Sequence, residues 1–147
     1  MIYFTPMVHA LHWDWVKMRA APLLCEDTCG IMAIRDTGDI LAAAVFDSFT
    51  NTTCMVHLAI ENPLAIRSGL LTEAANYLFH TRNRERIFGM TPSNNDRALK
   101  FNRHMGWVEL YRVENAYDVG VDYVVQVITK ADCKWLLDQP QKEAVNG

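Results

Sequence analysis

Two side chains that can accept a proton stand near the end of an apolar run over residues 54–60. Alternation along a strand places His57 and Glu61 on the same face. Either group could take a proton from a reacting group, directly or through a water molecule. We therefore expect acid–base chemistry at the end of this strand, with Glu61 ahead of His57. A hydrogen-bonded core histidine beside an ordinary strand end is the alternative interpretation.

The segment after this strand has the features of an anion-binding loop. Arg67, Ser68 and Gly69 stand directly before an apolar pattern of helical period over residues 70–81. A helix N-terminus offers backbone N–H donors and a favourable dipole to a phosphate group. Arg67 and Ser68 would add a charge and a hydroxyl, and Gly69 permits close approach to the backbone. A plain helix start explains the same residues without a ligand.

The elements that would position these residues follow from periodicity. Strands are predicted at 1–5, 31–35, 40–50, 54–60, 87–90, 108–113 and 123–129, and helices at 7–19, 70–81 and 95–104. Short turns over residues 31–60 predict an antiparallel meander, whereas a helix between two strands is the usual link of a parallel pair. The predicted class is α/β (α+β): a mixed, mostly antiparallel sheet of six to seven strands, flanking helices, and one parallel strand pair that splays apart. Ligands bind outside the carboxyl ends of such strands.

The composition excludes several classes of protein. The chain has 147 residues, of which 50% are hydrophobic, so it can form one core, expected over residues 1–130. Residues 131–147 are expected to form a short helix and a polar tail. A net charge of −3 with interspersed signs argues against nucleic-acid binding. No apolar stretch approaches the ~20 residues that span a bilayer. The N-terminus lacks a secretion signal, so we expect the four cysteines to be reduced in the cytoplasm.

A zinc site is one competing interpretation. His9 and His12 would share a helix face, and Cys25 and Cys29 could complete a set of four ligands. The loose spacing of the cysteines and the neighbouring tryptophans favour a packing helix instead. We therefore expect no metal.

A second competing motif is Asp36-Thr37-Gly38, which matches the short motif of aspartic proteases. Arg35 precedes the aspartate, where those proteases need an apolar residue. The predicted helix content is also too high for that small β-rich class. The three residues are better explained as a hairpin turn in which Gly38 takes a positive φ.

The clearest motif covers residues 95–107, Asn-Asp-Arg-Ala-Leu-Lys-Phe-Asn-Arg-His-Met-Gly-Trp. Its spacing and the element order resemble the GNAT acyltransferase superfamily, whose second signature has Asn, Ala, Tyr and Gly at these intervals. The tyrosine position holds Asn102. The family's pyrophosphate loop, (Gln/Arg)-x-x-Gly-x-(Gly/Ala), keeps Gly69 but has Ile66 first and Leu71 last. The chain thus resembles a degenerate, small member of the kind carried by some tailed phages.

The resemblance implies an N-acyltransferase that moves an acetyl group from acetyl-CoA to an amine on a small molecule or a protein. Glu61 would be the base, with His57 second, and Asn102 would stand where the family places an acid. The resemblance assigns the pantetheine arm to the backbone of Leu58, Ala59 and Ile60, the pyrophosphate to Arg67, Ser68, Gly69, Leu70 and Leu71, and other cofactor contacts to Asn95, Arg97 and Asn102. A homodimer is left open.

A catalytically silent GNAT-like module for protein binding or regulation is the alternative. Asn102 can donate a hydrogen bond but not usefully a proton, and Leu71 is larger than the residue of the family loop. An exposed surface rich in Trp, Met and Tyr would favour this function. A structural component of a larger particle is a third option, for which the sequence has no specific sign.

Overall fold

The structure, a computed structural model, describes residues 1–20, 22 and 24–137. All seven predicted strands and the three predicted long helices are present. In chain order the elements are β1 Ile2–Pro6, α1 His9–Lys17, β2 Cys29–Arg35, β3 Ile40–Asp47, β4 Thr53–Ile60, α2 Leu64–Arg67, α3 Leu70–Asn76, the π-helix Tyr77–Thr81, β5 Arg86–Pro92, α4 Asp96–His104, β6 Val108–Asp118, β7 Val121–Thr129 and α5 Lys134–Leu137.

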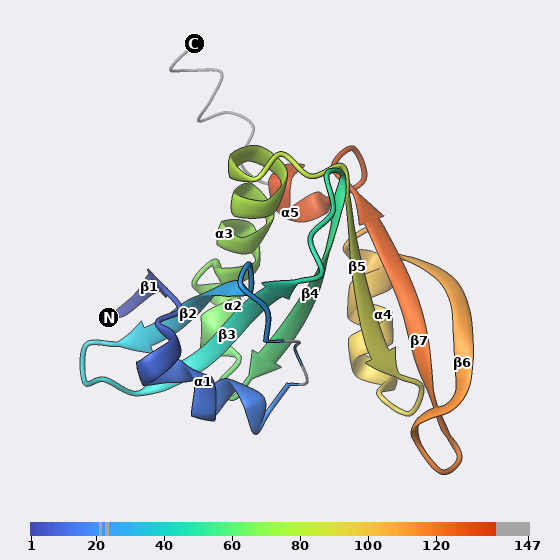
Figure 1. Cartoon of the computed structure of the whole chain (residues 1–147), viewed down its shortest axis with the longest axis horizontal. Helices are drawn as coiled ribbons and strands as arrows, with labels where there is room; N and C mark the ends of the chain where they lie inside the picture. The colour runs from blue at the N-terminus through green and yellow to red at the C-terminus, as the bar shows by residue number, and fades with distance from the viewer. Residues whose placement is uncertain (21, 23, 138–147) are drawn as a thin grey trace.

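One mixed sheet of seven strands, ordered β1-β2-β3-β4-β5-β7-β6, organises the molecule (Figure 1). Every neighbouring pair is antiparallel except β4 and β5, which are parallel. The predicted sheet and its parallel pair are therefore confirmed. The antiparallel meander arises because short turns join β2, β3 and β4, whereas the connection from β4 to β5 carries a helix across one face.

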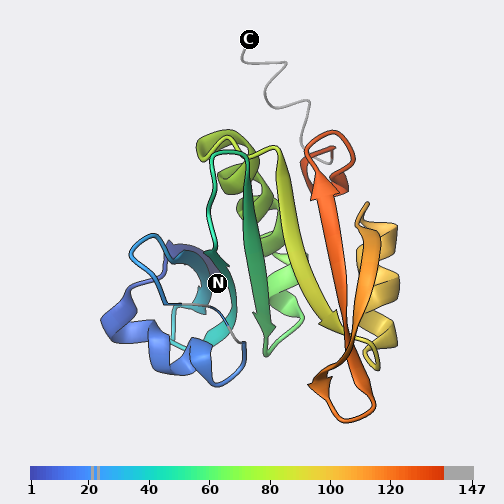
Figure 2. The same cartoon turned by 45° about the vertical axis from the view of Figure 1, so that its right-hand side comes forward.

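Helices cover the two faces unequally (Figure 2). The helix α1 packs Val16 against Met32 and Val45 on one face of the β1–β4 half. The main core lies on the opposite face, where α3 contributes Leu70, Leu71, Ala74 and Ala75. On this second face α4 contacts β5 and β7 through hydrogen bonds. The edge strand β6 has only exposed residues.

The sequence did not predict the short helix α2. Pro63 precedes it with φ −61°, and the side-chain oxygen of Asn62 accepts a hydrogen bond from the Leu64 amide at 3.0 Å. These two residues start the turn as a helix. Gly69, with φ +106°, ends it and allows α3 to begin directly. The strand β6 also runs to Asp118, further than the predicted end at 113.

The chain after residue 130 returns to the core. Cys133 is fully buried and Trp135 is 6% exposed. Trp135 meets Trp107 edge to face, with ring centroids 6.3 Å apart, and the Lys134 amide donates to the carbonyl of Met105. The predicted short helix is α5, and its packing extends the folded unit past residue 130. The predicted polar tail over 138–147 lies outside the described residues.

The competing motifs have structural explanations. Asp36, Thr37 and Gly38 form the turn between β2 and β3, and Gly38 has φ +96°. His12 accepts a hydrogen bond from the Val8 amide through Nδ1 at 2.8 Å. Within the described residues, no cluster of three or more His, Cys, Asp or Glu side chains could hold a metal ion.

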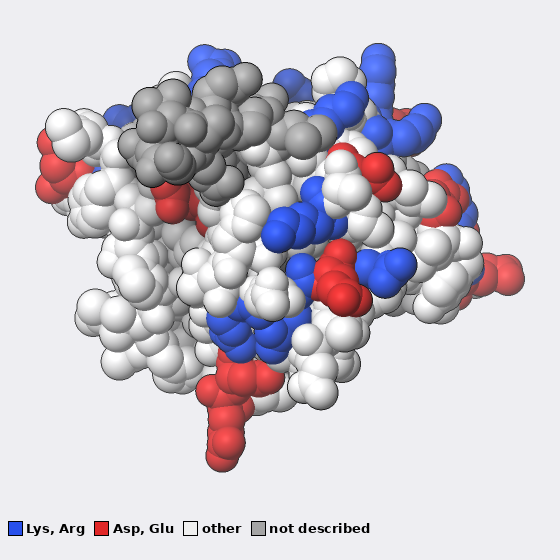
Figure 3. Space-filling model, turned by 90° about the horizontal axis from the view of Figure 1, so that it is seen from above, with Lys and Arg blue, Asp and Glu red and all other residues white. Residues whose placement is uncertain are grey.

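The helices and the surface charges are the features of the structure that bear on membranes and nucleic acids. No described helix combines the length and apolar character that a bilayer crossing needs. On the face seen in Figure 3, Lys and Arg side chains lie among Asp and Glu side chains.

Gly106 gives a test of how the C-terminal segment is held. Its φ is +108°, and a Cβ there would lie 2.1 Å from the Asp132 carbonyl oxygen. We expect Gly106→Ala to lose about 1–2 kcal/mol of unfolding free energy for the backbone conformation. Overlap with Asp132 should cost about 1–3 kcal/mol more. Urea unfolding measures the sum of these two losses in unfolding free energy.

The matched control is Gly38→Ala. Gly38 also has a positive φ, but no atom lies within 4 Å of the added Cβ. This variant should therefore lose only the backbone contribution. Equal losses in the two variants would contradict the close contact at Gly106.

Candidate functional site

The candidate site is a slot between β4 and β5. The two strands pair only over Thr53–Met55 and Arg86–Phe88. Beyond this, β4 stays with β3 as far as Ile60, and β5 stays with β7 as far as Pro92. The strands diverge along their carboxyl-terminal halves (Figures 1 and 2), and a cavity of about 640 Å³ lies between them.

A tryptophan fills the base of the slot. Trp107 is 5% exposed, and a Cβ on Gly89 would lie 3.4 Å from its ring. Gly89 directly follows Phe88, the last residue of β5 that pairs with β4. Because Gly89 has no side chain, the indole can lie against the backbone where the strands part. The slot thus depends on an aromatic ring supplied by the start of the β6 arm.

Polar side chains from both walls face the cavity. They are His57, Arg67, Thr91, Asn95, Arg97, Asn102 and Gln126. None of the lining residues is an aspartate or a glutamate, and two are arginines. The cavity therefore combines positive charge with neutral polar and apolar side chains.

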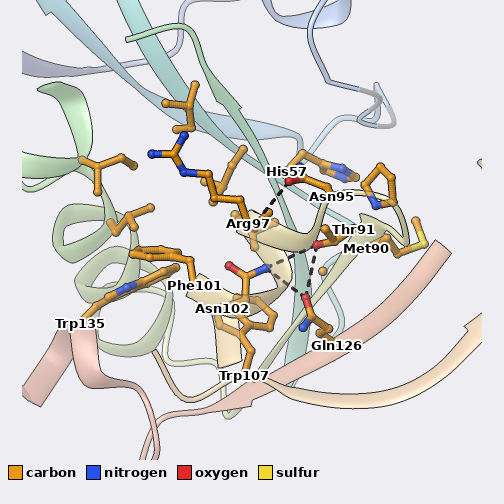
Figure 4. Close-up of a pocket in the computed structure, with 18 of the residues that line it drawn as sticks. His57, Met90, Thr91, Asn95, Arg97, Phe101, Asn102, Trp107, Gln126 and Trp135 are labelled. Carbon is orange, nitrogen blue, oxygen red and sulfur yellow. Dashed lines mark hydrogen bonds between the residues drawn. The ribbon is translucent and has the colours of Figure 1, made fainter. Parts of the chain in front are cut away.

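A hydrogen-bonded triad joins α4 to the sheet beneath the slot (Figure 4). The side-chain Nδ2 of Asn102 donates to Gln126 Oε1 at 3.1 Å and to Thr91 Oγ1 at 3.4 Å. The Thr91 hydroxyl also donates to Gln126 Oε1, at 3.3 Å. Thr91 and Gln126 are buried, so this network satisfies polar atoms that would otherwise destabilise the wall.

The triad determines what Asn102 can offer a ligand. Its amide nitrogen carries two hydrogens, and both are directed at Thr91 and Gln126. Its oxygen points away from these partners, toward Phe101 (Figure 4). Asn102 thus presents a hydrogen-bond acceptor rather than a donor. Asn95, also on the cavity wall, caps α4 by accepting from the Ala98 amide at 3.2 Å, as the sequence predicted.

His57 is paired with a buried carboxylate. Its Nε2 lies 2.8 Å from Asp47 Oδ2, and the two side chains are 14% and 1% exposed. Both residues project from the sheet face that α1 covers, because His57 pairs with Val45 and Asp47 lies two residues further along β3. A carboxylate at one ring nitrogen fixes the orientation of the imidazole. The other nitrogen is left for a different partner.

Glu61 lies outside the cavity lining. Its Oε2 forms an ion pair with Arg19 Nε at 3.0 Å, and its side chain is 58% exposed. The Arg19 guanidinium also stacks on the Trp15 ring, 4.1 Å from the centroid. This arrangement ties the end of β4 to α1. Through Arg19 and Trp15, Glu61 therefore makes a structural contact with α1.

The predicted pyrophosphate loop is only partly exposed to the slot. Arg67 and Leu71 line the cavity, whereas Ser68, Gly69 and Leu70 do not. The amides from Leu64 to Gly69 all donate to acceptors within residues 62–66. Leu71 is only 4% exposed and packs in the main core. Arg67 is thus the main polar group that α2 presents to the slot.

Along β4, the predicted backbone segment divides between slot and core. Leu58 and Ile60 line the cavity, whereas Ala59, on the same strand face as His57, is 3% exposed and is not among the lining residues. Arg97, from the first turn of α4, lines the wall opposite Arg67. The structure thus brings His57, Leu58, Ile60, Arg67, Leu71, Asn95, Arg97 and Asn102 around one cavity.

Other titratable side chains form a cluster distant from the slot lining. Arg82 donates to the Tyr77 hydroxyl at 3.0 Å and stacks 4.0 Å from the Phe49 centroid. Burial raises the pKa of the Tyr77 hydroxyl, and it raises the pKa of the Cys54 thiol to about 12. Neither group can act as a thiolate or phenolate at neutral pH. His57 is therefore the one lining side chain suited to accept a proton from an amine.

Sequence reasoning missed three polar residues of the site, Asp47, Thr91 and Gln126. Two of these residues could have been found from the sequence, because each is a polar residue in an apolar strand. Gln126 is the one polar residue in the run Val124–Ile128, and Asp47 ends the apolar strand β3. A polar residue in a buried strand needs a hydrogen-bond partner, so both positions called for one.

No family model matches the sequence, and a comparison with curated proteins found no significant match. Solved structures are similar in fold. Spermidine/spermine N-acetyltransferase from Vibrio cholerae has a TM-score of 0.73 and 10% identity, covering 94% of this chain and 96% of that one. Ribosomal-protein-S18-alanine N-acetyltransferase from Escherichia coli has a TM-score of 0.72 and 13% identity, covering 88% and 94%.

A candidate phosphinothricin N-acetyltransferase is similar to the same degree. Its TM-score is 0.70 at 15% identity, covering 88% of this chain and 98% of that one. The likeness therefore spans nearly the full length of all three proteins, at identities that support an argument from fold alone. The element order, the sheet order and the parting of β4 from β5 show that this chain has the GNAT fold.

Proposed function

We propose that this protein is an N-acyltransferase that transfers an acetyl group from acetyl-CoA to an amine. The observation that carries the proposal is the slot between β4 and β5, with arginines on both walls and a carboxylate-paired histidine at its side. The amine is that of a small molecule or a protein. A cytoplasmic location and a phage-type origin remain parts of this proposal.

The edge of β4 offers a binding line for the pantetheine arm. Beyond Met55 this edge pairs with no strand of the described chain. Backbone groups at such an edge bind extended ligands that contain amides, in the way that a strand adds to a sheet. Pantetheine has two amides, and the apolar side chains of Leu58 and Ile60 would pack beside it. A backbone N–H here would also stabilise the oxyanion that forms at the thioester carbonyl.

Arg67 and Arg97 are the proposed phosphate ligands. They line opposite walls of one cavity, and hydrogen bonds between arginine and phosphate are strong and directional. The amides of α2 are already bonded internally. The first amides of α3, from Leu70, have no acceptor within their own helix. The two guanidinium groups would therefore provide most of the binding energy for the pyrophosphate. Ser68 and Gly69 lie next to Arg67 in the sequence.

His57 is the proposed base. It lines the cavity, and Asp47 holds one ring nitrogen, so the other is oriented to accept the proton of the attacking amine. Glu61, the first base predicted from the sequence, is held by Arg19 outside the lining. The thioester of the co-substrate supplies the acetyl group and a thiolate leaving group. Asn102 offers that thiolate neither a proton nor a free N–H group.

A catalytically silent GNAT-like module is the second candidate. The engagement of both Asn102 hydrogens in the triad favours it, because the position cannot then assist the leaving group. In that case the slot would bind acyl-CoA, or another ligand of similar shape, to regulate a protein partner. Binding alone is compatible with both candidates, so turnover separates them.

Calorimetry with acetyl-CoA tests the shared part of the proposal. We expect a dissociation constant in the micromolar range. Arg67→Ala and Arg97→Ala should each weaken binding about tenfold, since each removes a charge-assisted hydrogen bond. Arg103→Ala is the matched control, because Arg103 lies on the same helix as Arg97 but outside the cavity lining. The absence of heat and of a thermal shift at millimolar acetyl-CoA would contradict the proposal.

Thiol release from acetyl-CoA with a panel of amines tests the base. We expect His57→Ala to lower kcat/KM about 100-fold, as for the loss of a general base. Glu61→Gln should change it less than about threefold, because its ion pair holds it outside the cavity lining. A larger loss of kcat/KM in Glu61→Gln than in His57→Ala would identify Glu61 as the base. Binding without release for any amine would favour the silent module.

A further inference from the structure

The edge strand β6 exposes apolar side chains on a free sheet edge. It is the last strand in the sheet order, and all eleven of its residues are exposed. Val108 is 55% exposed, Leu110 49%, Tyr111 58% and Val113 41%. A long apolar edge strand with unpaired backbone groups is a template for pairing with another strand. Its occupant must therefore provide both backbone hydrogen bonds and an apolar surface.

The sequence of β6 is complementary to itself. Its first six residues read Val-Glu-Leu-Tyr-Arg-Val over 108–113. In an antiparallel pair about a twofold axis between positions 110 and 111, Val108 faces Val113 of the second copy and Glu109 faces Arg112. Leu110 then faces Tyr111. Every pair joins apolar with apolar or acid with base, as stable cross-strand pairs do.

The faces of the strand agree with this pairing. Glu109 lies opposite Gln126, and Arg112 lies opposite Val124, so both project on the face that α4 covers. Val108, Tyr111 and Val113 lie opposite Val127, Val125 and Tyr123, on the other face. A twofold axis perpendicular to the sheet keeps each face on its own side. The charges would therefore meet on one face, and Val108, Tyr111 and Val113 would meet on the other.

We infer that two copies of this chain pair β6 to β6 in antiparallel register 108–113, joining their sheets into one. The partner is thus a second copy. In a single copy, Arg112 Nε donates to Glu109 Oε1 at 2.9 Å, and this hydrogen bond lowers the pKa of Glu109. Both side chains are therefore charged and already lie together. On pairing, Glu109 exchanges Arg112 of its own chain for Arg112 of the second copy, and Arg112 likewise exchanges Glu109.

Charge reversal with mixing tests the register. Glu109→Arg places two arginines at each crossed pair, and Arg112→Glu places two glutamates there. Each variant alone should dissociate at least about tenfold more readily than the wild type. In an equimolar mixture every crossed pair again joins opposite charges, so the dimer should return. The pair within each chain stays like-charged in the mixture, so intrachain effects cannot produce this recovery.

The measurement is sedimentation velocity of the full chain at protein concentrations of about 1–100 µM. This range brackets the dissociation constants of weak dimers. The wild type should reach twice the monomer mass of 16.8 kDa. Lys17→Glu on α1 is the control for the charge change of Arg112→Glu, and circular dichroism confirms folding. A wild type that stays monomeric, single variants that dimerise as the wild type does, or a mixture that stays dissociated would each overturn the inference.

Discussion

The parting of two parallel strands after three residue pairs is the constraint on which the rest of this structure depends. Each strand keeps an antiparallel partner on its other side, so the unpaired backbone is confined to the two edges that face the slot. Trp107 against Gly89 fills the base and prevents the edges from closing. The slot thus arises from an incomplete sheet, and the completed side of each strand supplies the rigidity.

The two walls of the slot contribute different chemistry because they belong to different halves of the sheet. The β4 wall carries His57, oriented by Asp47 from β3, and the turn α2 adds Arg67. The β5 wall carries a neutral network in which Asn102 bridges Thr91 and Gln126. Such a network is stable when every hydrogen has an acceptor, and it then fixes side-chain orientation. His57 and Arg67 therefore lie across the slot from a neutral hydrogen-bonded network, on a wall to which α4 also contributes Arg97.

The sequence predicted the elements well because strands and helices bury alternating or helical sets of apolar residues within one segment. It predicted the Asn95 cap for the same reason, since the cap depends on Ala98 three residues away. The pairs His57–Asp47 and Thr91–Gln126 join different strands, so no local pattern reveals them. The turn α2 was missed because Pro63 and Gly69 are typical of loops, and capping by Asn62 decided the outcome.

The departures from the GNAT signatures are coupled by packing. Leu71 fills the core beneath α2 instead of leaving a small residue at a phosphate. Burial of Leu71 accompanies a helical turn whose amides already donate to oxygens within residues 62–66. In the proposed function, phosphate recognition therefore passes to side chains. Asn102 likewise turns its hydrogens into the wall, where a tyrosine would point a hydroxyl outward. In the proposed function, recognition therefore relies on the charges of Arg67 and Arg97, and the chemical step relies on His57 alone.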